Sequence, residues 1–191
     1  MLKIGITGGI GSGKSIFCDL LKAMGYPVYN SDLEAKNLCN ESEALKSSLK
    51  EAFGKNLYDD GVLNKAVFSS IIFNDNKKLE QANNIIHPAV ISDFLHWAKI
   101  QNSSIVFIES AILFESKLQN FIDKSIAISA PEEIRMQRVM DRDSVSKEVV
   151  LMRIKNQLSE AERLQKADYI IYNDDKQLLI PQLEKVLSLL Q

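Results

Sequence analysis

A glycine-rich stretch near the N-terminus carries the residue types that bind the phosphates of a nucleotide. Residues 7–16 read TGGIGSGKSI and contain the pattern G-x-x-x-x-G-K-S. Glycines let backbone N–H groups converge on phosphate oxygens in conformations that a Cβ atom forbids. In such a loop the lysine reaches the β- and γ-phosphates and the serine hydroxyl is a ligand of Mg²⁺. The sequence therefore predicts an ATP site with Mg²⁺ as cofactor, formed by Gly9, Gly11, Ser12, Gly13, Lys14, Ser15 and Ile16.

Ile16 is the unusual residue of this loop. Many such loops carry a second hydroxyl at this position, which can contact the α-phosphate, whereas here only the backbone N–H can do so. We therefore expect somewhat weaker nucleotide binding without loss of activity. The loop otherwise has the required context, because an apolar strand precedes it and an amphipathic helix, whose N-terminus favours anions, follows it.

The elements that position this loop form an alternating pattern. Near-continuous apolar runs are typical of strands that are buried on both faces of a parallel sheet, and helical segments between them indicate a doubly wound α/β core. The predicted strands are 2–7, 27–31, 104–110, 124–129 and 168–173. The predicted helices are 13–24, 33–52, 64–73, 76–99, 131–142, 146–165 and 175–190.

The spacing of the strands predicts two insertions. About seventy residues separate the second strand from the third, far more than a simple crossover needs, so residues 33–103 should form a helical lobe that binds the second substrate. Residues 135–165 follow the fourth strand and should form a small lid, and the stretch 130–157 carries four arginines. The nucleotide-binding core then consists of residues 1–32, 104–134 and 166–191.

Composition limits the classes of function. The net charge of −2 argues against a general nucleic-acid binder, which needs an excess of basic residues. The two cysteines, Cys18 and Cys39, form no C-x-x-C pair and are interpreted as reduced, packed thiols. We find neither a leader-like apolar segment before the loop nor a run long enough to span a bilayer, so we expect a soluble, cytoplasmic protein without membrane partners. The sequence does not predict the oligomeric state.

A phosphate loop can serve a switch, a motor or a transferase. The N-K-x-D element of a GTP switch is absent from the sequence, and the chain is short for a motor. A kinase acting on an alcohol needs a carboxylate near the γ-phosphate, and such groups lie at the carboxyl ends of parallel strands. Asp32 and Glu109 follow the second and third strands. Either could instead cap a helix or be a solvated charge.

Several longer stretches together resemble the dephospho-coenzyme A kinase family. The resemblance runs from Lys3 to about Leu183. The stretches that carry it are IGITGGIGSGKS, GYPVYNSD, FGKNLYDDGVLNK followed by IIFND, NNIIHPAV, FIESAILFES, RMQRVMDRD, RIKNQ and ADYIIYN, in that order. It implies transfer of the γ-phosphate of ATP to the ribose 3′-hydroxyl of dephospho-coenzyme A, the last step of coenzyme A synthesis. It also implies a five-stranded parallel sheet of the phosphate-loop kinase type, with a helical substrate lobe and a small lid.

The resemblance assigns roles to single residues. It makes Asp32 the catalytic carboxylate, and Lys14 and Arg142 its catalytic partners. It places His87 beside the acceptor, together with Lys65, which stands where an arginine is usual. Glu109 stands where an aspartate is usual, so its part beside Ser15 in holding the metal depends on a side chain that is one methylene longer. Ala111 replaces a usual proline and should loosen a turn.

Other candidates keep two interpretations. Arg138 and Arg142 lie one helical turn apart and should close on the triphosphate, unless they form a solvated basic face; Arg135 and Arg153 are weaker candidates. Glu115 either binds substrate or caps the following segment, and Asn173 should line the adenine pocket. His96 is interpreted as structural, and the C-terminal helix as an element of the core. The alternative functions are a kinase for another nucleoside or nucleotide and a regulator that binds ATP without turnover.

Overall fold

The computed structural model describes residues 1–72 and 75–190, and the chain divides into two compact units. The first unit contains residues 1–29 and 101–191, and the second contains residues 30–100. The predicted substrate lobe, 33–103, covers nearly the same residues as the second unit. The predicted lid, residues 135–165, falls within the first unit. That these residues form a separate lid remains a prediction.

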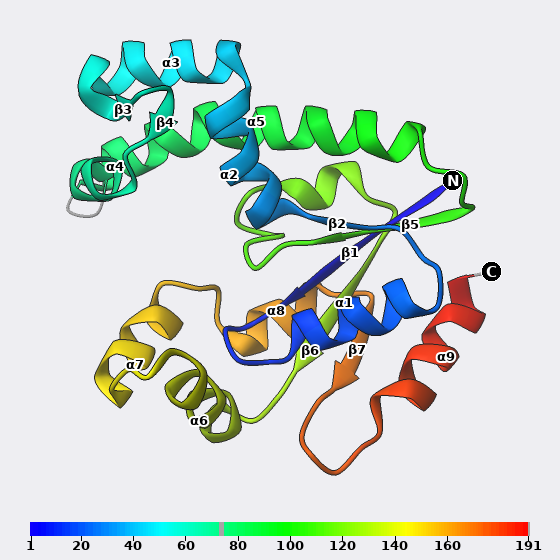
Figure 1. Ribbon diagram of the computed structural model, residues 1–191. Coiled ribbons are helices and arrows are strands. Elements are labelled where there is room, and N and C mark those ends of the chain that lie inside the picture. Colours follow the sequence, from blue (N-terminus) through cyan, green and yellow to red (C-terminus); the bar gives the residue numbers. More distant parts are fainter. Residues whose placement is uncertain (73–74, 191) are drawn as a thin grey trace. The chain divides into compact units, whose positions relative to one another are not determined.

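The first unit is built on a five-stranded parallel sheet, which confirms the predicted fold class (Figure 1). Each strand lies within one residue or so of its predicted bounds. The strands in sheet order are β2 (Val28–Asn30), β5 (Ile105–Glu109), β1 (Leu2–Gly8), β6 (Lys124–Ser129) and β7 (Tyr169–Tyr172). The apolar runs are buried as expected, since β1, β5 and β6 lie inside the sheet and have neighbours on both sides.

Helices cover both faces of this sheet. On one face α1 (Lys14–Ala23) and α9 (Leu179–Leu190) pack against the strands and bury Phe17 and Leu183 completely. On the other face the side chain of Leu113 lies against Gly5, so that the segment after β5, with the short 3₁₀ helix Leu118–Phe121, covers β1. The helices α6 (Glu132–Asp143), α7 (Lys147–Lys155) and α8 (Glu160–Lys166) lie between β6 and β7 in the chain.

The second unit is mostly helical and has its own apolar core. It contains α2 (Ser31–Glu41), α3 (Glu43–Phe53), α4 (Lys65–Ile72) and α5 (Asn76–Lys99), with the short hairpin β3 (Tyr58–Asp59) and β4 (Val62–Leu63) and a 3₁₀ turn, Lys55–Leu57, before it. The core residues are Cys39, Leu45, Leu49, Leu57 and Tyr58. The hairpin lies within FGKNLYDDGVLNK, between the predicted helices 33–52 and 64–73.

Two helices that the sequence predicts as continuous are each divided into two. The predicted helix 33–52 is two helices, because Ser42 is extended and its hydroxyl accepts a hydrogen bond from Leu45 N–H, which caps α3. The predicted helix 146–165 is also two, because Ser159 and Glu162 form a capping box that starts α8. The last helix begins at Leu179 rather than 175. Residue 73, at the predicted end of α4, lies outside the described residues.

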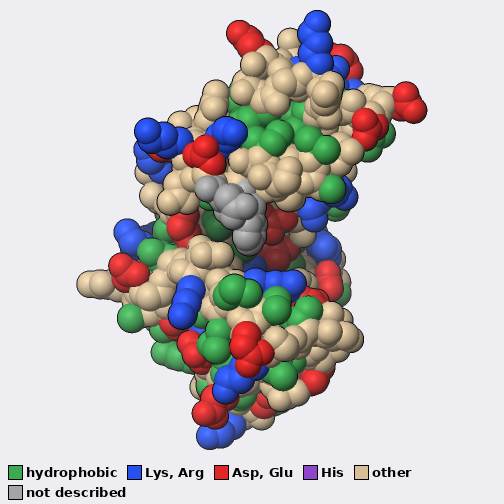
Figure 2. All heavy atoms as spheres, turned by 90° about the vertical axis from the view of Figure 1, so that its left-hand side faces the viewer, with side chains coloured by type: hydrophobic (Ala, Val, Ile, Leu, Met, Phe, Trp, Pro, Cys, Tyr) green, Lys and Arg blue, Asp and Glu red, His purple; other side chains and the backbone are tan. Residues whose placement is uncertain are grey.

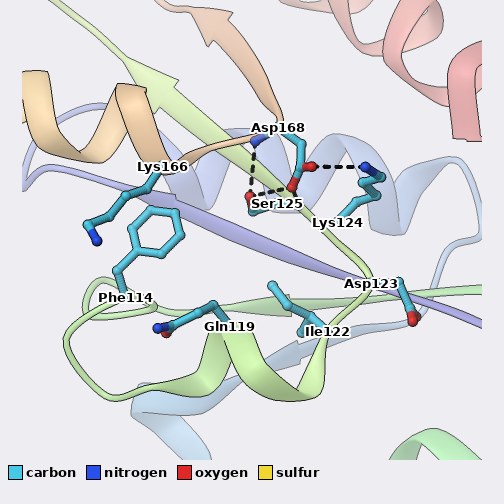
Figure 3. Close-up of a pocket in the computed structure, with 8 residues that line it drawn as sticks. All are labelled: Phe114, Gln119, Ile122, Asp123, Lys124, Ser125, Lys166 and Asp168. Atoms are coloured by element: carbon cyan, nitrogen blue, oxygen red, sulfur yellow. Dashed lines mark hydrogen bonds and ion pairs between the residues drawn. The ribbon is translucent and has the colours of Figure 1, made fainter.

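A polar joint connects β6 and β7 at their amino ends, where a pocket of about 230 Å³ opens (Figure 3). The Asp168 carboxylate accepts hydrogen bonds from Ser125 N–H at 2.9 Å and Ser125 Oγ at 2.8 Å. Its other oxygen pairs with the Lys124 ammonium at 3.0 Å. Although burial acts to raise it, the pKa of Asp168 is lowered by the hydrogen bonds from Lys124 and Ser125. The charges of Asp168 and Lys124 are paired with each other, which indicates that the role of this joint is structural.

We expect Asp168→Ala to lower the melting temperature by roughly 4–8 °C, because the variant loses about two net hydrogen bonds that join β6 to β7. A lowered pKa means that this stabilisation is present above the unfolded pKa of about 4 and is lost as the pH falls through the folded value. The melting difference between variant and parent should therefore shrink below about pH 4. Lys124→Ala is the control and should change little, since its ion pair is half exposed. Equal losses in both variants would contradict this account.

Candidate active site

The phosphate loop follows β1 and leads into α1 (Figure 1). Gly11 and Gly13 have φ values of 77° and 92°, the left-handed region that favours glycine. A Cβ at Gly13 would clash with the Asn173 side chain. Lys14 Nζ donates a hydrogen bond to Gly8 O at 2.8 Å, which folds the lysine back along the loop. The backbone of the loop therefore requires glycine at both positions.

A pocket of about 410 Å³ opens beside this loop. It is lined by the loop, by the first turns of α1 and by two arginines of α6, all within the first unit. Ser15 and Ile16 are exposed there, and Ile16 keeps 59% of its surface. The lining residues are Ile10, Gly11, Gly13, Lys14, Ser15, Ile16, Arg138 and Arg142. The pocket thus brings both predicted lid arginines to the phosphate loop.

Asn173 and Arg138 hold the loop through hydrogen bonds at its backbone and at the end of β7. The buried Asn173 amide donates to Ser12 O at 2.8 Å, and Arg138 Nη2 donates to Asn173 O at 3.2 Å. Arg138 also pairs with Asp175 and approaches Gly11 O at 3.5 Å. The side-chain nitrogen of Asn173 is thus bonded to the phosphate loop, and its place in the adenine pocket stays a prediction.

Arg142 is exposed and pairs with its neighbour in the chain. Its Nε and Nη2 donate to the Asp143 carboxylate at 2.7 and 3.2 Å, and Arg153 Nη1 donates to the same group at 2.6 Å. These hydrogen bonds lower the pKa of Asp143 to about 2. Arg142 also lines the pocket beside the phosphate loop, and its closing on the triphosphate stays a prediction.

Two arginines are buried beneath the loop. Arg135 is 4% exposed, and its Nε donates to Ala130 O at 3.0 Å. Arg163 is 1% exposed and donates to Glu160 at 2.8 Å. A Cβ at Gly9 would clash with the Arg135 guanidinium, so this glycine is required by close approach. Arg135 was considered for the lid, but its guanidinium lies in the interior. Arg163 went unnoticed, because nothing in its local sequence separates it from a surface arginine of α8.

Asp32 is the second residue of α2 and lies two residues after Asn30, the last residue of β2. Its side chain is exposed, and the cap of this helix is Asn30, whose Oδ1 accepts from Leu33 N–H at 2.9 Å. The alternative role of Asp32 as helix cap is therefore wrong. Asp32 lines a pocket of about 480 Å³ within the second unit. The other lining residues are Ala35, Lys36, Cys39, Asn40, Leu63, Lys65, Phe68, Ser69 and Ile86.

The remaining candidates lie at defined places. Lys65 is the first residue of α4 and lines the same pocket as Asp32. His87 is half-buried in α5, and burial lowers its pKa, which favours the neutral imidazole. Glu109 is the last residue of β5 and is also half-buried. The Glu115 carboxylate accepts a hydrogen bond from Leu158 N–H at 2.9 Å, a contact with a segment 43 positions away, and its role in binding substrate stays a prediction.

The donor set fits a magnesium ion that is held mainly by substrate. Within residues 1–72 and 75–190, no three His, Cys, Asp or Glu side chains gather into a group that could hold a metal by itself. Mg²⁺ in kinases usually has one or two protein ligands and keeps phosphate oxygens and waters as the others. The exposed Ser15 hydroxyl in the phosphate pocket suits this arrangement.

Acidic and basic side chains are mixed on the surface (Figure 2), and both cysteines lie in the interior. On the face shown in Figure 2, Lys and Arg side chains are interspersed with Asp and Glu side chains on each unit. Among the described helices, none is both long enough and apolar enough to cross a membrane. Cys18 and Cys39 are free and buried. Burial raises the pKa of both thiols, with the Glu109 carboxylate adding to the rise at Cys18. The absence of a nucleic-acid partner remains a prediction.

Comparison with known proteins gives one consistent description. The sequence profile of the family described as dephospho-CoA kinase matches residues 2–178. A dephospho-CoA kinase of Porphyromonas gingivalis is 41% identical over 190 residues, which are 98% of this chain and 94% of that protein.

Two solved structures share the fold. A protein of Thermus thermophilus superposes with a TM-score of 0.81 and 32% identity, covering 99% of this chain and 95% of the other. A dephospho-CoA kinase from Campylobacter jejuni superposes with a TM-score of 0.69 and 26% identity, also covering 99% of this chain and 95% of the other.

Proposed function

The chain belongs to the dephospho-CoA kinase family, and from this premise we propose which residues carry its reaction and how. It is an enzyme that phosphorylates dephospho-coenzyme A with ATP and gives coenzyme A and ADP, the final step of coenzyme A biosynthesis. The observation that carries the assignment is a phosphate pocket with Lys14, Ser15 and two arginines in a chain that matches the family over residues 2–178.

The phosphate loop binds the donor. The backbone N–H groups of the glycine-rich loop and the N-terminus of α1 attract the phosphate oxygens, and Lys14 turns from Gly8 O to the β- and γ-phosphates. Gly9, Gly11, Ser12, Gly13 and Ile16 form the cradle, as proposed from the sequence, while Asn173 fixes Ser12 from behind. Because Ile16 offers no hydroxyl, the α-phosphate contacts only its backbone.

Asp32 orients the acceptor. The ribose 3′-oxygen forms a bond to the γ-phosphorus while the bond to the β–γ bridging oxygen breaks and ADP leaves. The proton of the hydroxyl passes to the Asp32 carboxylate, late in a loose transition state. Lys65 shares the pocket of Asp32 and supplies a positive charge for the acceptor's phosphates. We place His87 on the acceptor as well, as a neutral hydrogen-bonding group.

Ser15 would hold Mg²⁺, and Glu109 would be the second protein group beside the ion. When bound, the ion neutralises charge on the β- and γ-phosphates. The protein's own part is to present one hydroxyl and one carboxylate. We propose that the enzyme works in the cytoplasm on ATP and dephospho-coenzyme A, without nucleic acid or membrane.

Arg142→Ala tests the proposed lid. We expect turnover to fall about tenfold to a thousandfold, since one charged donor to the transferring phosphoryl group is lost. Binding of dephospho-coenzyme A alone should stay within about twofold. Steady-state kinetics and equilibrium acceptor binding measure the two effects. Arg153→Ala is the control, because it removes the other partner of Asp143 while leaving Arg142 in place. A collapse of acceptor affinity with unchanged turnover would assign Arg142 to the substrate lobe instead.

The acceptor is tested by measuring ADP release with dephospho-coenzyme A, adenosine, AMP and pantothenate. We expect release with dephospho-coenzyme A only. Release with adenosine or AMP would favour a kinase for another nucleoside or nucleotide, and ATP binding without release would indicate a regulator.

A further inference from the structure

The connection between α7 and α8 is bonded to the centre of the phosphate loop. Gln157 follows α7, and its side-chain Oε1 accepts a hydrogen bond from Ile10 N–H at 2.9 Å. Ile10 stands between Gly9 and Gly11, in the middle of the loop, and is 147 positions away in the chain. The segment that carries Arg142 and Arg153 therefore ends in direct contact with the loop that binds the phosphates.

The backbone next to Gln157 is held by two hydrogen bonds at Leu158. The next residue, Leu158, donates its N–H to Glu115 Oε1 at 2.9 Å, and its carbonyl accepts from Arg163 Nη2 at 2.6 Å. The Arg163 side chain is 2% exposed and is paired with Glu160. A buried, doubly bonded guanidinium has little freedom to move, so the backbone at Leu158 is fixed and the Gln157 side chain has a defined starting point.

A glycine-rich loop needs such support. Its glycines lose more conformational entropy on ordering than other residues do. The N–H groups that bind phosphate are effective only when they are already in place. Two of the loop's amides are directed to protein acceptors, Ile10 N–H to Gln157 and Ser12 N–H to Gly9 O at 3.1 Å. The bond to Gln157 thus restricts the middle of the loop from the outside.

We propose that Gln157 is a positioning residue for the phosphoryl donor: its carbonyl oxygen fixes the phosphate loop at Ile10, and Glu115 and Arg163 position Gln157 through Leu158. The proposal rests on the proposed function in that its ligand is ATP. It also gives Glu115 a function that needs no contact with the acceptor.

Gln157→Met tests this, because methionine keeps the length of the side chain and removes the acceptor. We expect equilibrium binding of MgATP, measured by calorimetry without acceptor, to weaken about 3- to 10-fold, the usual worth of one net hydrogen bond. The KM for dephospho-coenzyme A and the melting temperature should stay close to those of the parent. Asn156→Ala is the matched control: it removes an exposed amide one residue away and should bind MgATP like the parent.

A second pair of variants tests the route through Glu115. Glu115→Met should weaken MgATP in the same direction as Gln157→Met, while Glu115→Gln, which keeps an acceptor oxygen for Leu158 N–H, should restore parent-like binding. MgATP affinity within twofold of the parent in Gln157→Met would overturn the proposal. So would equal weakening in Asn156→Ala, or a loss that merely follows a fall in melting temperature.

A rise in the acceptor KM alone in Glu115→Met would overturn the assigned route, because it would make Glu115 a substrate ligand. The proposed function fails separately. A parent enzyme that binds MgATP but does not phosphorylate dephospho-coenzyme A would refute the acceptor, while the comparison of MgATP affinities would still decide the role of Gln157.

Discussion

Lys14→Ala should reduce phosphoryl transfer by at least about a thousandfold while leaving the fold intact. The ammonium is the one lysine charge of the phosphate pocket, and charge that develops on the transferring group is what such a site stabilises. The Lys14 ammonium is hydrogen-bonded to Gly8 O. Its removal costs the hydrogen bond to Gly8 O of a half-buried group, so we expect at most a small change in melting temperature.

ADP release with saturating dephospho-coenzyme A measures this loss, and circular dichroism with thermal melting reports the fold. Lys22→Ala is the control on the same helix, since Lys22 is exposed and its ammonium lies 3.3 Å from the exposed Asp19 carboxylate. It should turn over like the parent. Unchanged turnover in Lys14→Ala would remove the phosphate-loop assignment altogether.

The parts of the site that could be predicted are those encoded by neighbouring residues. Lys14 and Ser15 follow from eight consecutive positions, and the strand and helix around them follow from apolar runs that bury Ile4, Ile6 and Phe17 completely. The sheet could be predicted for the same reason, because each strand is a short apolar run with clear ends. In the helical lobe the pattern indicated helices but missed the cap at Ser42, since one serine in a charged, helix-favouring stretch gives a weak signal.

The parts that could not be predicted depend on contacts between distant residues. Gln157 stands within RIKNQ, one of the stretches that carry the family resemblance, yet its bond to Ile10 spans 147 positions and leaves no periodic signal. The burial of Arg163 is likewise decided by the fold, since an arginine on an amphipathic helix ordinarily keeps its guanidinium in water. The bond from Asn173 to Ser12 O also could not be predicted, because it joins residues 161 positions apart.

Asp32→Asn should lower turnover about a hundredfold or more, the usual worth of a positioned base. Asparagine keeps the size and hydrogen bonding of the side chain but removes its charge and basicity. Asp32 is exposed in the first turn of α2, and the cap of that helix is Asn30, so the substitution leaves the capping hydrogen bond in place. MgATP affinity should stay within a few-fold of the parent, because the phosphate loop is unchanged.

Glu34→Gln is the matched control for Asp32→Asn. Both residues are acidic side chains in the first turn of α2, so both substitutions remove one negative charge near the same helix N-terminus, worth about 0.3–1 kcal/mol. Equal small losses of stability are expected in the two variants, with turnover lost only in Asp32→Asn. Rapid-quench measurement of a single turnover separates the chemical step from product release. If Asp32→Asn transfers phosphate at the parent rate, its carboxylate serves only the helix dipole, and Glu109 at the end of β5 becomes the next candidate for the base.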